Sequence, residues 1–587
     1  MRTKSRRTAT SKPQARNRNR PGFVDPPSVP PEFEELPPSI PLRSKLHSYV
    51  LLISATVICL LPFSGRAFHI DDTLFIRAAQ QIAKHPLDPY GFQINWDGVL
   101  TSMADVTQNP PLSSYYTALV GTLFGWSEWA LHCGFLLVAI ALVLGTYRLA
   151  ARFTRAPLLA ALMTLLCPGV LVSASSVMCD TMMLALWLWA VILWIEGIER
   201  KSAVCLAFSS LLIAACALTK YFGVSLLPLL LVYTLMRRSL RAALWLLVPV
   251  AILAWYQQWT AGLYGHGLLF GAADFAATQR AATTGSELAV GIVGLSFAGG
   301  CGIFGLLYAP LLWSRRNIAV TALLSIIASA SIMYGGLSIG LRIGGPEAER
   351  SHVLTGIELA FFIAAGVSLL ALAMRSIWKD RLAGSVLLSL WVLGTFLFAA
   401  YVNYTVNARS VYPLIPAAAV LLMRRLDAAN ILSERRTMSA VAILIVISGA
   451  FSFWVAAGDA ALANSARQAA ALSVSKAGGA TVWFEGHWGF QYYMEALGAR
   501  ELDFSNLELK PGDFVVVPSN NIQIRSVPPQ LVAARYSFDL PLNNWVTTVS
   551  WQLGAGFYAS YWGPIPFAVG RVPRESYTIF RISDSKR

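Results

Sequence analysis

The chain has 587 residues, with 46 Lys and Arg against 31 Asp and Glu, so its formal net charge at pH 7 is +15. Hydrophobic residues make up 56% of the chain and charged residues only 13%, about half of the roughly 25% typical of soluble domains. A large water-exposed surface is therefore excluded, and most of the chain is expected to lie in a membrane.

The N-terminal segment carries much of the basic excess. Eight Lys or Arg residues fall within positions 1–20, and prolines recur up to Pro41 without an apolar period. Such a composition cannot bury a core, so 1–45 is predicted to be a disordered tail. Nucleic-acid binding is one interpretation of the tail. A cytoplasmic location under the positive-inside rule is favoured, and no nucleic-acid partner is expected.

Thirteen apolar runs are predicted to be membrane helices, since a helix needs roughly 20 residues to cross about 30 Å of hydrocarbon. The seven cysteines lie in apolar runs at no metal-binding spacing. The transmembrane domain is predicted over 46–457, and its runs are 46–63, 129–151, 157–175, 180–195, 203–219, 221–236, 241–259, 288–313, 317–340, 352–374, 383–403, 409–423 and 438–457.

The loop 64–128, between the first two runs, is predicted to hold two surface helices. The first opens at Asp71 and Asp72 and carries an apolar face of Leu74, Phe75, Ala78, Ala79 and Ile82. Either carboxylate can serve as an N-cap, and adjacent carboxylates at a membrane surface can also supply a general base. The second helix follows Asn109-Pro110-Pro111-Leu112.

The run 111–126 is predicted to lie at the membrane surface rather than to cross. With that placement, every strongly basic loop falls on the same side as the N-terminal tail, as the positive-inside rule requires. These loops are 148–155, 200–201, 237–241, 315–316, 375–381 and 424–436. The N-terminus is then cytoplasmic, and the loop 64–128 and the C-terminus lie on the outer side.

Three long apolar stretches are each interrupted by one ionisable residue. Asp180 interrupts 157–195, Lys220 interrupts 203–236 and Arg409 interrupts 383–423, each at an outer turn. The two helices beside Lys220 share 34 residues, which gives each only about 25 Å, so this turn is expected below the membrane surface. A cap at Asp180 and snorkelling of either cation are structural alternatives. Two cations at the outer leaflet favour an anionic ligand such as a phosphate.

The composition changes after residue 457. Segments 481–485, 514–518, 545–551 and 577–582 have the pattern of strands, and 488–497 that of a helix. A small extracytoplasmic α/β domain is therefore predicted over 458–587.

The order of these motifs resembles the C-type glycosyltransferases, in particular the family 39-like branch of protein O-mannosyltransferases and aminoarabinose lipid A transferases. The resemblance covers roughly 46–457. The residues that carry it are Asp71 and Asp72 after the first span, Asn109 before Pro-Pro-Leu, Asp180 at the third span, Thr219-Lys220, and Arg409 followed by Tyr412 and Pro416. In this branch Glu is common at the position of Asp72 and His at that of Asn109.

The resemblance implies an enzyme of the bacterial inner membrane that uses a polyprenyl-phosphate sugar on the periplasmic side. Asp71, helped by Asp72, would deprotonate an acceptor on a lipid, polysaccharide or protein, and the reaction would invert the anomeric carbon. Lys220 and Arg409 would bind the donor phosphate, with Asp180, Asn109 and Tyr412 in support. No cofactor and no metal ion are expected.

Two other classes of function remain as alternatives. A secondary transporter or lipid flippase would also have many spans and charges within them, although no paired interrupted helices mark inverted repeats. In a non-catalytic scaffold the carboxylates would act only as helix caps.

Overall fold

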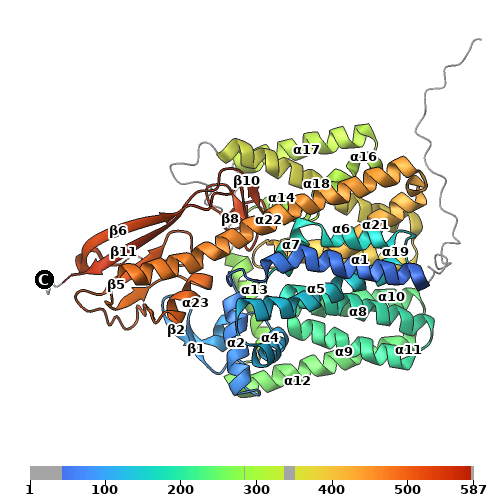
Figure 1. Ribbon diagram of the computed structural model, residues 1–587. Helices are drawn as coiled ribbons and strands as arrows, with labels where there is room; N and C mark the ends of the chain where they lie inside the picture. Colours follow the sequence, from blue (N-terminus) through green and yellow to red (C-terminus); the bar gives the residue numbers. More distant parts are fainter. Residues whose placement is uncertain (1–41, 283–284, 336, 338–350, 526, 584–587) are drawn as a thin grey trace, which may run out of the picture. The chain divides into compact units, whose positions relative to one another are not determined.

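The computed structural model describes residues 42–282, 285–335, 337, 351–525 and 527–583 (Figure 1). The predicted disordered tail falls mainly on 1–41, which lie outside the described residues. The first helix already begins at Leu42.

Apart from the loop 64–128, the chain from the first helix to the C-terminal strands is almost entirely helical (Figure 1). The helices of this region are α1 Leu42–Leu60, α5 Glu128–Ala150, α6 Pro157–Leu165, α7 Pro168–Ala174, α8 Cys179–Glu199, α9 Ala203–Thr219, α10 Leu226–Met236, α11 Leu240–Ala243, α12 Leu247–Tyr264, α13 Leu268–Ala282, α14 Glu287–Cys301, α15 Phe304–Leu307, α16 Ala309–Leu312, α17 Arg315–Met333, α18 Ser351–Asp380, α19 Ala383–Leu397, α20 Ala408–Val411, α21 Leu414–Ala428 and α22 Arg435–Lys476.

Within the described residues, 8 helices are long and apolar enough to cross a membrane, and up to 10 spans result if each of two bent helix pairs is one span. The apolar helices on either side of Lys220 are shorter, Ala203–Thr219 and Tyr221–Met236. All thirteen predicted runs overlap helices. The polytopic helical fold is thus confirmed, whereas the count of thirteen spans stays a prediction.

The loop 64–128 contains the two predicted surface helices, α2 Asp72–Lys84 and α4 Leu112–Phe124. Between them lie the antiparallel strands β1 Gln93–Asn95 and β2 Leu100–Ser102 and the short helix α3 Met103–Val106. Ala79 and Ile82 of α2 pack against Ala118 of α4. With 13 residues, α4 is about 20 Å long and too short to cross the hydrocarbon.

The C-terminal region contains a five-stranded sheet in the order β4-β3-β5-β11-β6. Strand β3 pairs in parallel with β4 and β5, and β11 pairs antiparallel with β5 and β6. The predicted helix is α23 Trp488–Ala496, and the sheet consists of β3 Val482–Phe484, β4 Arg500–Glu501, β5 Phe514–Pro518, β6 Val532–Leu540 and β11 Glu575–Ile582. The predicted boundary at residue 458 lies inside α22, whose 42 residues rise about 63 Å, twice the hydrocarbon thickness.

A buried ion pair joins the start of the loop 64–128 to α22. Arg66 Nη1 donates to Asp459 Oδ2 at 2.9 Å and to Ser175 Oγ at 2.7 Å. Asp459 also accepts hydrogen bonds from the hydroxyls of Thr548 and Tyr558 in the C-terminal region. The side chains of Arg66 and Asp459 are 1% and 0% exposed, and breaking such a pair typically costs about 3–5 kcal/mol. The pair therefore fixes the loop beside the C-terminal region.

Candidate active site

Asp180 lies at the centre of the charged residues predicted from the sequence. It belongs to the first turn of α8 and is almost fully buried. Its Oδ1 accepts a hydrogen bond from Lys220 Nζ at 2.6 Å, and its Oδ2 accepts one from Arg409 Nε at 2.7 Å. Lys220 occupies the extended turn after α9, and Arg409 lies in the short helix α20. Three segments far apart in sequence thus meet at one carboxylate.

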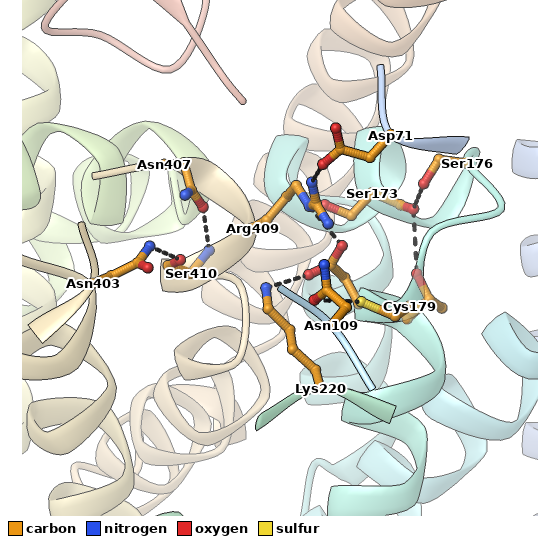
Figure 2. A network of polar contacts seen from close by, with 12 residues as sticks. Asp71, Asn109, Ser173, Ser176, Cys179, Lys220, Asn403, Asn407, Arg409 and Ser410 are labelled. Atoms are coloured by element: carbon orange, nitrogen blue, oxygen red, sulfur yellow. Dashed lines mark hydrogen bonds and ion pairs between the residues drawn. The ribbon is translucent and has the colours of Figure 1, made fainter. Parts of the chain in front are cut away.

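Asp71 extends this arrangement on the other side of Arg409. Arg409 Nη1 donates to Asp71 Oδ2 at 2.6 Å (Figure 2). Asp71 occupies the N-cap position of α2, but its side chain makes no capping hydrogen bond. The capping interpretation therefore does not account for this carboxylate. Asp71, Arg409, Asp180 and Lys220 form one continuous chain of ion pairs, hereafter the ion-pair chain.

The side chains at the two ends of the ion-pair chain are partly exposed, whereas those at its centre are buried. The side chains of Asp71 and Lys220 are 27% and 16% exposed, against 10% for Arg409 and 2% for Asp180. Two carboxylates balance two cations, which a buried charge cluster requires. A ligand can therefore reach a carboxylate at one end and an ammonium group at the other.

Asp72 does not join the ion-pair chain. It is fully buried, and its Oδ2 and Oδ1 accept the backbone N–H groups of His69 and Val177 at 2.9 and 3.0 Å. Burial raises the pKa of Asp72 to about 6. Successive residues of a helix point about 100° apart, which explains why Asp71 and Asp72 have different surroundings. Asp72 anchors the start of α2 to the turn before α8.

Of the other predicted residues, Asn109 borders the ion-pair chain and Tyr412 lies behind it. Cys179, the neighbour of Asp180, donates its Sγ–H to Asn109 Oδ1 at 3.6 Å (Figure 2). Asn109 and Asp71 line the same small pocket. Tyr412 is fully buried in the helical core, so its place is in packing rather than on the open face.

Three polar residues that the sequence analysis did not select stabilise the short helix α20, which carries Arg409. Asn407 caps α20, its Oδ1 accepting the Ser410 N–H at 2.8 Å, and Asn403 Nδ2 donates to Ser410 Oγ at 2.7 Å (Figure 2). A π-helical turn, Phe398–Val402, precedes them, and such turns are frequent at functional sites. One of them could have been found in the sequence, because Asn407 precedes the isolated Arg409 by two residues and Asn is a common N-cap.

An apolar groove begins two residues after Lys220. Its volume is about 220 Å³, and Phe222, Trp187, Leu229, Trp391 and Gly394 are among its lining residues. The ring of Trp187 stacks on Phe222 with 5.3 Å between centroids. The lining residue Phe222 thus connects this apolar surface, within two positions of the sequence, to the cationic end of the ion-pair chain.

No metal centre is evident in the described part of the chain, where no three His, Cys, Asp or Glu side chains are grouped to hold a metal ion. The sequence-based expectation of a reaction without a metal ion stays a prediction.

Comparisons with known proteins give one family match and several distant structural similarities. Residues 108–259, which include Asn109, Asp180 and Lys220, match the family model described as dolichyl-phosphate-mannose-protein mannosyltransferase. No curated protein sequence matches the chain significantly.

Three of the similar solved structures come from different enzymes. The apo oligosaccharyltransferase of Archaeoglobus fulgidus is 13% identical with a TM-score of 0.48, and the match covers 78% of this chain and 64% of the archaeal chain. ArnT from Cupriavidus metallidurans, bound to undecaprenyl phosphate, is 13% identical with a TM-score of 0.42 over 82% of this chain and 94% of its own. The mycobacterial arabinofuranosyltransferase AftD is 14% identical with a TM-score of 0.35 over 94% of this chain and 40% of its own.

The family match, residues 108–259, holds two members of the ion-pair chain and part of the polytopic helical fold. It confirms the predicted resemblance of this multi-pass membrane protein to the C-type glycosyltransferases.

Proposed function

We propose that the protein transfers a sugar from a polyprenyl-phosphate donor to a hydroxyl or phosphate group of an acceptor, with inversion of the anomeric carbon. The observation that carries this proposal is the ion-pair chain, with a carboxylate at one open end and a cation at the other. A phosphate leaving group needs cations, and an acceptor hydroxyl needs a base. The acceptor is a lipid, a polysaccharide or a protein.

Lys220 and Arg409 bind the donor phosphate in this mechanism. Both cations are held by Asp180, at 2.6 and 2.7 Å, so they are oriented before the donor arrives. As the bond between the anomeric carbon and the phosphate oxygen breaks, the electron pair passes to the lipid phosphate. Fixed cations stabilise this growing negative charge in the transition state.

Asp71 accepts the proton of the acceptor. In the ligand-free arrangement its carboxylate pairs with Arg409. The donor phosphate competes for Arg409 and so frees the carboxylate. Asp71 then takes the proton while the acceptor oxygen bonds to the anomeric carbon from the face opposite the phosphate. One displacement inverts that carbon.

Loop charges support an extracytoplasmic site in an inner or plasma membrane. Lys220 lies in the turn between α9 and α10, whereas Arg200, Lys201, Arg237 and Arg238 lie at the opposite ends of these two helices. The positive-inside rule assigns those basic ends to the cytoplasm. With two cations available for the phosphate, we also propose that no metal ion is needed, so that EDTA leaves the rate unchanged.

Lys220→Met is expected to lower kcat by about 10²- to 10³-fold, the usual effect of removing one group that stabilises transition-state charge. The measurement is release of polyprenyl phosphate in proteoliposomes. The donor is identified with wild-type protein, which is supplied in turn with a panel of polyprenyl-phosphate sugars and an envelope-lipid acceptor extract. Lys84→Met, at an exposed lysine of the same outer face, is the matched control. Equal rates for the two variants would refute a phosphate-binding role for Lys220.

The apolar groove beside Lys220 is proposed to receive the first isoprene units of the donor. Gly394 lines this groove, and a Cβ there would meet no atom within 4 Å. Gly394→Leu therefore projects a side chain into the groove and is expected to raise KM for the donor about tenfold with little change in kcat, since it removes binding shared by ground and transition states.

The control for this experiment is Gly262→Leu, a helical glycine of α12 with equally open surroundings that is not a lining residue of the groove. A KM that stays at the wild-type value in Gly394→Leu, with Gly262→Leu also unchanged, would assign the isoprenoid to another path.

A further inference from the structure

A second, larger groove lies between α17 and α18, apart from the candidate active site. Its volume is about 760 Å³, and its lining includes Ile326 of α17 and Ile357, Phe361 and Ala364 of α18. Both helices belong to candidate membrane spans, Arg315–Met333 and His352–Asp380. The groove is therefore expected to open to lipid hydrocarbon rather than to water.

The groove runs along α18 away from the C-terminal region. Near the start of α18, Thr355 Oγ1 donates to the Leu553 carbonyl at 3.0 Å. The lining residues of α18 extend from Ile357 to Ala371, a rise of about 21 Å. This length is about two thirds of the hydrocarbon thickness of about 30 Å. The far end of the groove lies toward the predicted cytoplasmic surface.

Polar and basic groups collect only at that far end. Trp313 Nε1 donates to Ser368 Oγ at 2.8 Å, and Arg316 lines the groove. Within the described parts of the chain, Arg316 makes no ion pair. Arg375 follows Ala371 by one helical turn on the same face, and its buried Nε has no hydrogen-bond partner in the described structure.

We propose that this groove binds an acyl chain of an anionic phospholipid from the leaflet opposite the candidate active site, with the lipid phosphate beside Arg316 and Arg375. The apolar length suits an acyl chain, and the unpaired guanidinium groups suit a phosphate. The polyprenyl donor does not fit here, because its phosphate must reach Lys220 on the other side of the membrane.

The test measures thermal stability and lipid binding of the delipidated full-length protein in dodecyl maltoside micelles. Phosphatidylglycerol is expected to raise the Tm, and phosphatidylcholine to raise it less. Arg316→Gln is expected to weaken phosphatidylglycerol binding about fivefold, the contribution of one arginine near an anionic lipid surface. Arg315→Gln, the adjacent exposed arginine that is not a lining residue, is the matched control and is expected to bind like wild type.

Ala364→Phe provides a second variant, because it narrows the groove and leaves every arginine in place. It is expected to lose the phosphatidylglycerol effect and to stay monodisperse at the size of wild type. Equal effects of both lipids, equal losses in Arg316→Gln and Arg315→Gln, or full lipid binding by Ala364→Phe would overturn the proposal. A smaller particle in Ala364→Phe would assign the groove to contact between protein copies instead.

Discussion

Asp71→Asn is expected to lower kcat by about 10²- to 10⁴-fold, the range that a positioned general base contributes, while the protein stays folded. Asparagine keeps an oxygen that can accept the hydrogen bond from Arg409, and Asp71 makes no capping hydrogen bond that the substitution would break. The measurement is the single-turnover rate with saturating donor in proteoliposomes, together with the Tm of the same preparation.

The control for Asp71→Asn is Asp105→Asn, because Asp105 is a carboxylate of the same loop, 64–128, and its side chain is 56% exposed. It is expected to have the wild-type rate. If Asp71→Asn turned over at a rate near that of wild type, the base would have to be sought elsewhere. If Asp71→Asn lost both its activity and its folded state, the carboxylate would instead be needed to hold the loop 64–128 in place.

Asp180→Asn is expected to have the largest effect on stability, about 3–5 kcal/mol, the usual cost of removing one partner from a buried ion pair. The Asp180 side chain is 2% exposed and holds both Lys220 and Arg409. The variant leaves two cations facing Asp71 alone. Its Tm in detergent, compared with that of wild type, measures the loss, and kcat is expected to fall as well because the cations are no longer oriented.

The double variant Asp180→Asn/Lys220→Met separates charge balance from packing. It removes one anion and one cation, so we expect it to be more stable than Asp180→Asn by about 1–3 kcal/mol, the coupling typical of contacting residues. Additive losses in the double variant would show that Lys220 and Asp180 do not act as a pair.

Isolated charges in apolar runs were the most informative signal in the sequence. Asp180, Lys220 and Arg409 are each the only charge in a long apolar stretch, and the high cost of a solitary charge in a membrane marks each of them as notable. The structure brings the three together. It could not be predicted that Asp180 is the shared centre, because that depends on how α8, α9 and α20 pack.

The different surroundings of Asp71 and Asp72 also could not be predicted from the sequence. Both stand at the start of the same amphipathic helix, and the contacts of Asp72 with the backbone N–H groups of His69 and Val177 show that it serves the backbone. Tyr412 was selected because it matches a family motif, and that match did not show where its side chain lies. In the structure it belongs to a stretch whose side chains are almost all buried.

In the C-terminal region the predicted strands are confirmed where they are apolar, as in β5 and β11. Strand β6, Val532–Leu540, was missed because it lies at the sheet edge and its residues are largely exposed. The continuation of α22 past residue 457 was missed because its second half is rich in Ala and Ser, small residues that give no strong apolar period.

The buried pair between Arg66 and Asp459 bears on the order in which the protein is assembled. Arg66 precedes the candidate base Asp71 by only a few positions, whereas Thr548 and Tyr558, which complete the shell around Asp459, lie near the end of the sequence. During biosynthesis, the helices carrying the other charges are inserted long before these two hydroxyls leave the ribosome. The nascent polypeptide can therefore complete the shell that fixes its candidate base only after the segment with Thr548 and Tyr558 has been translated.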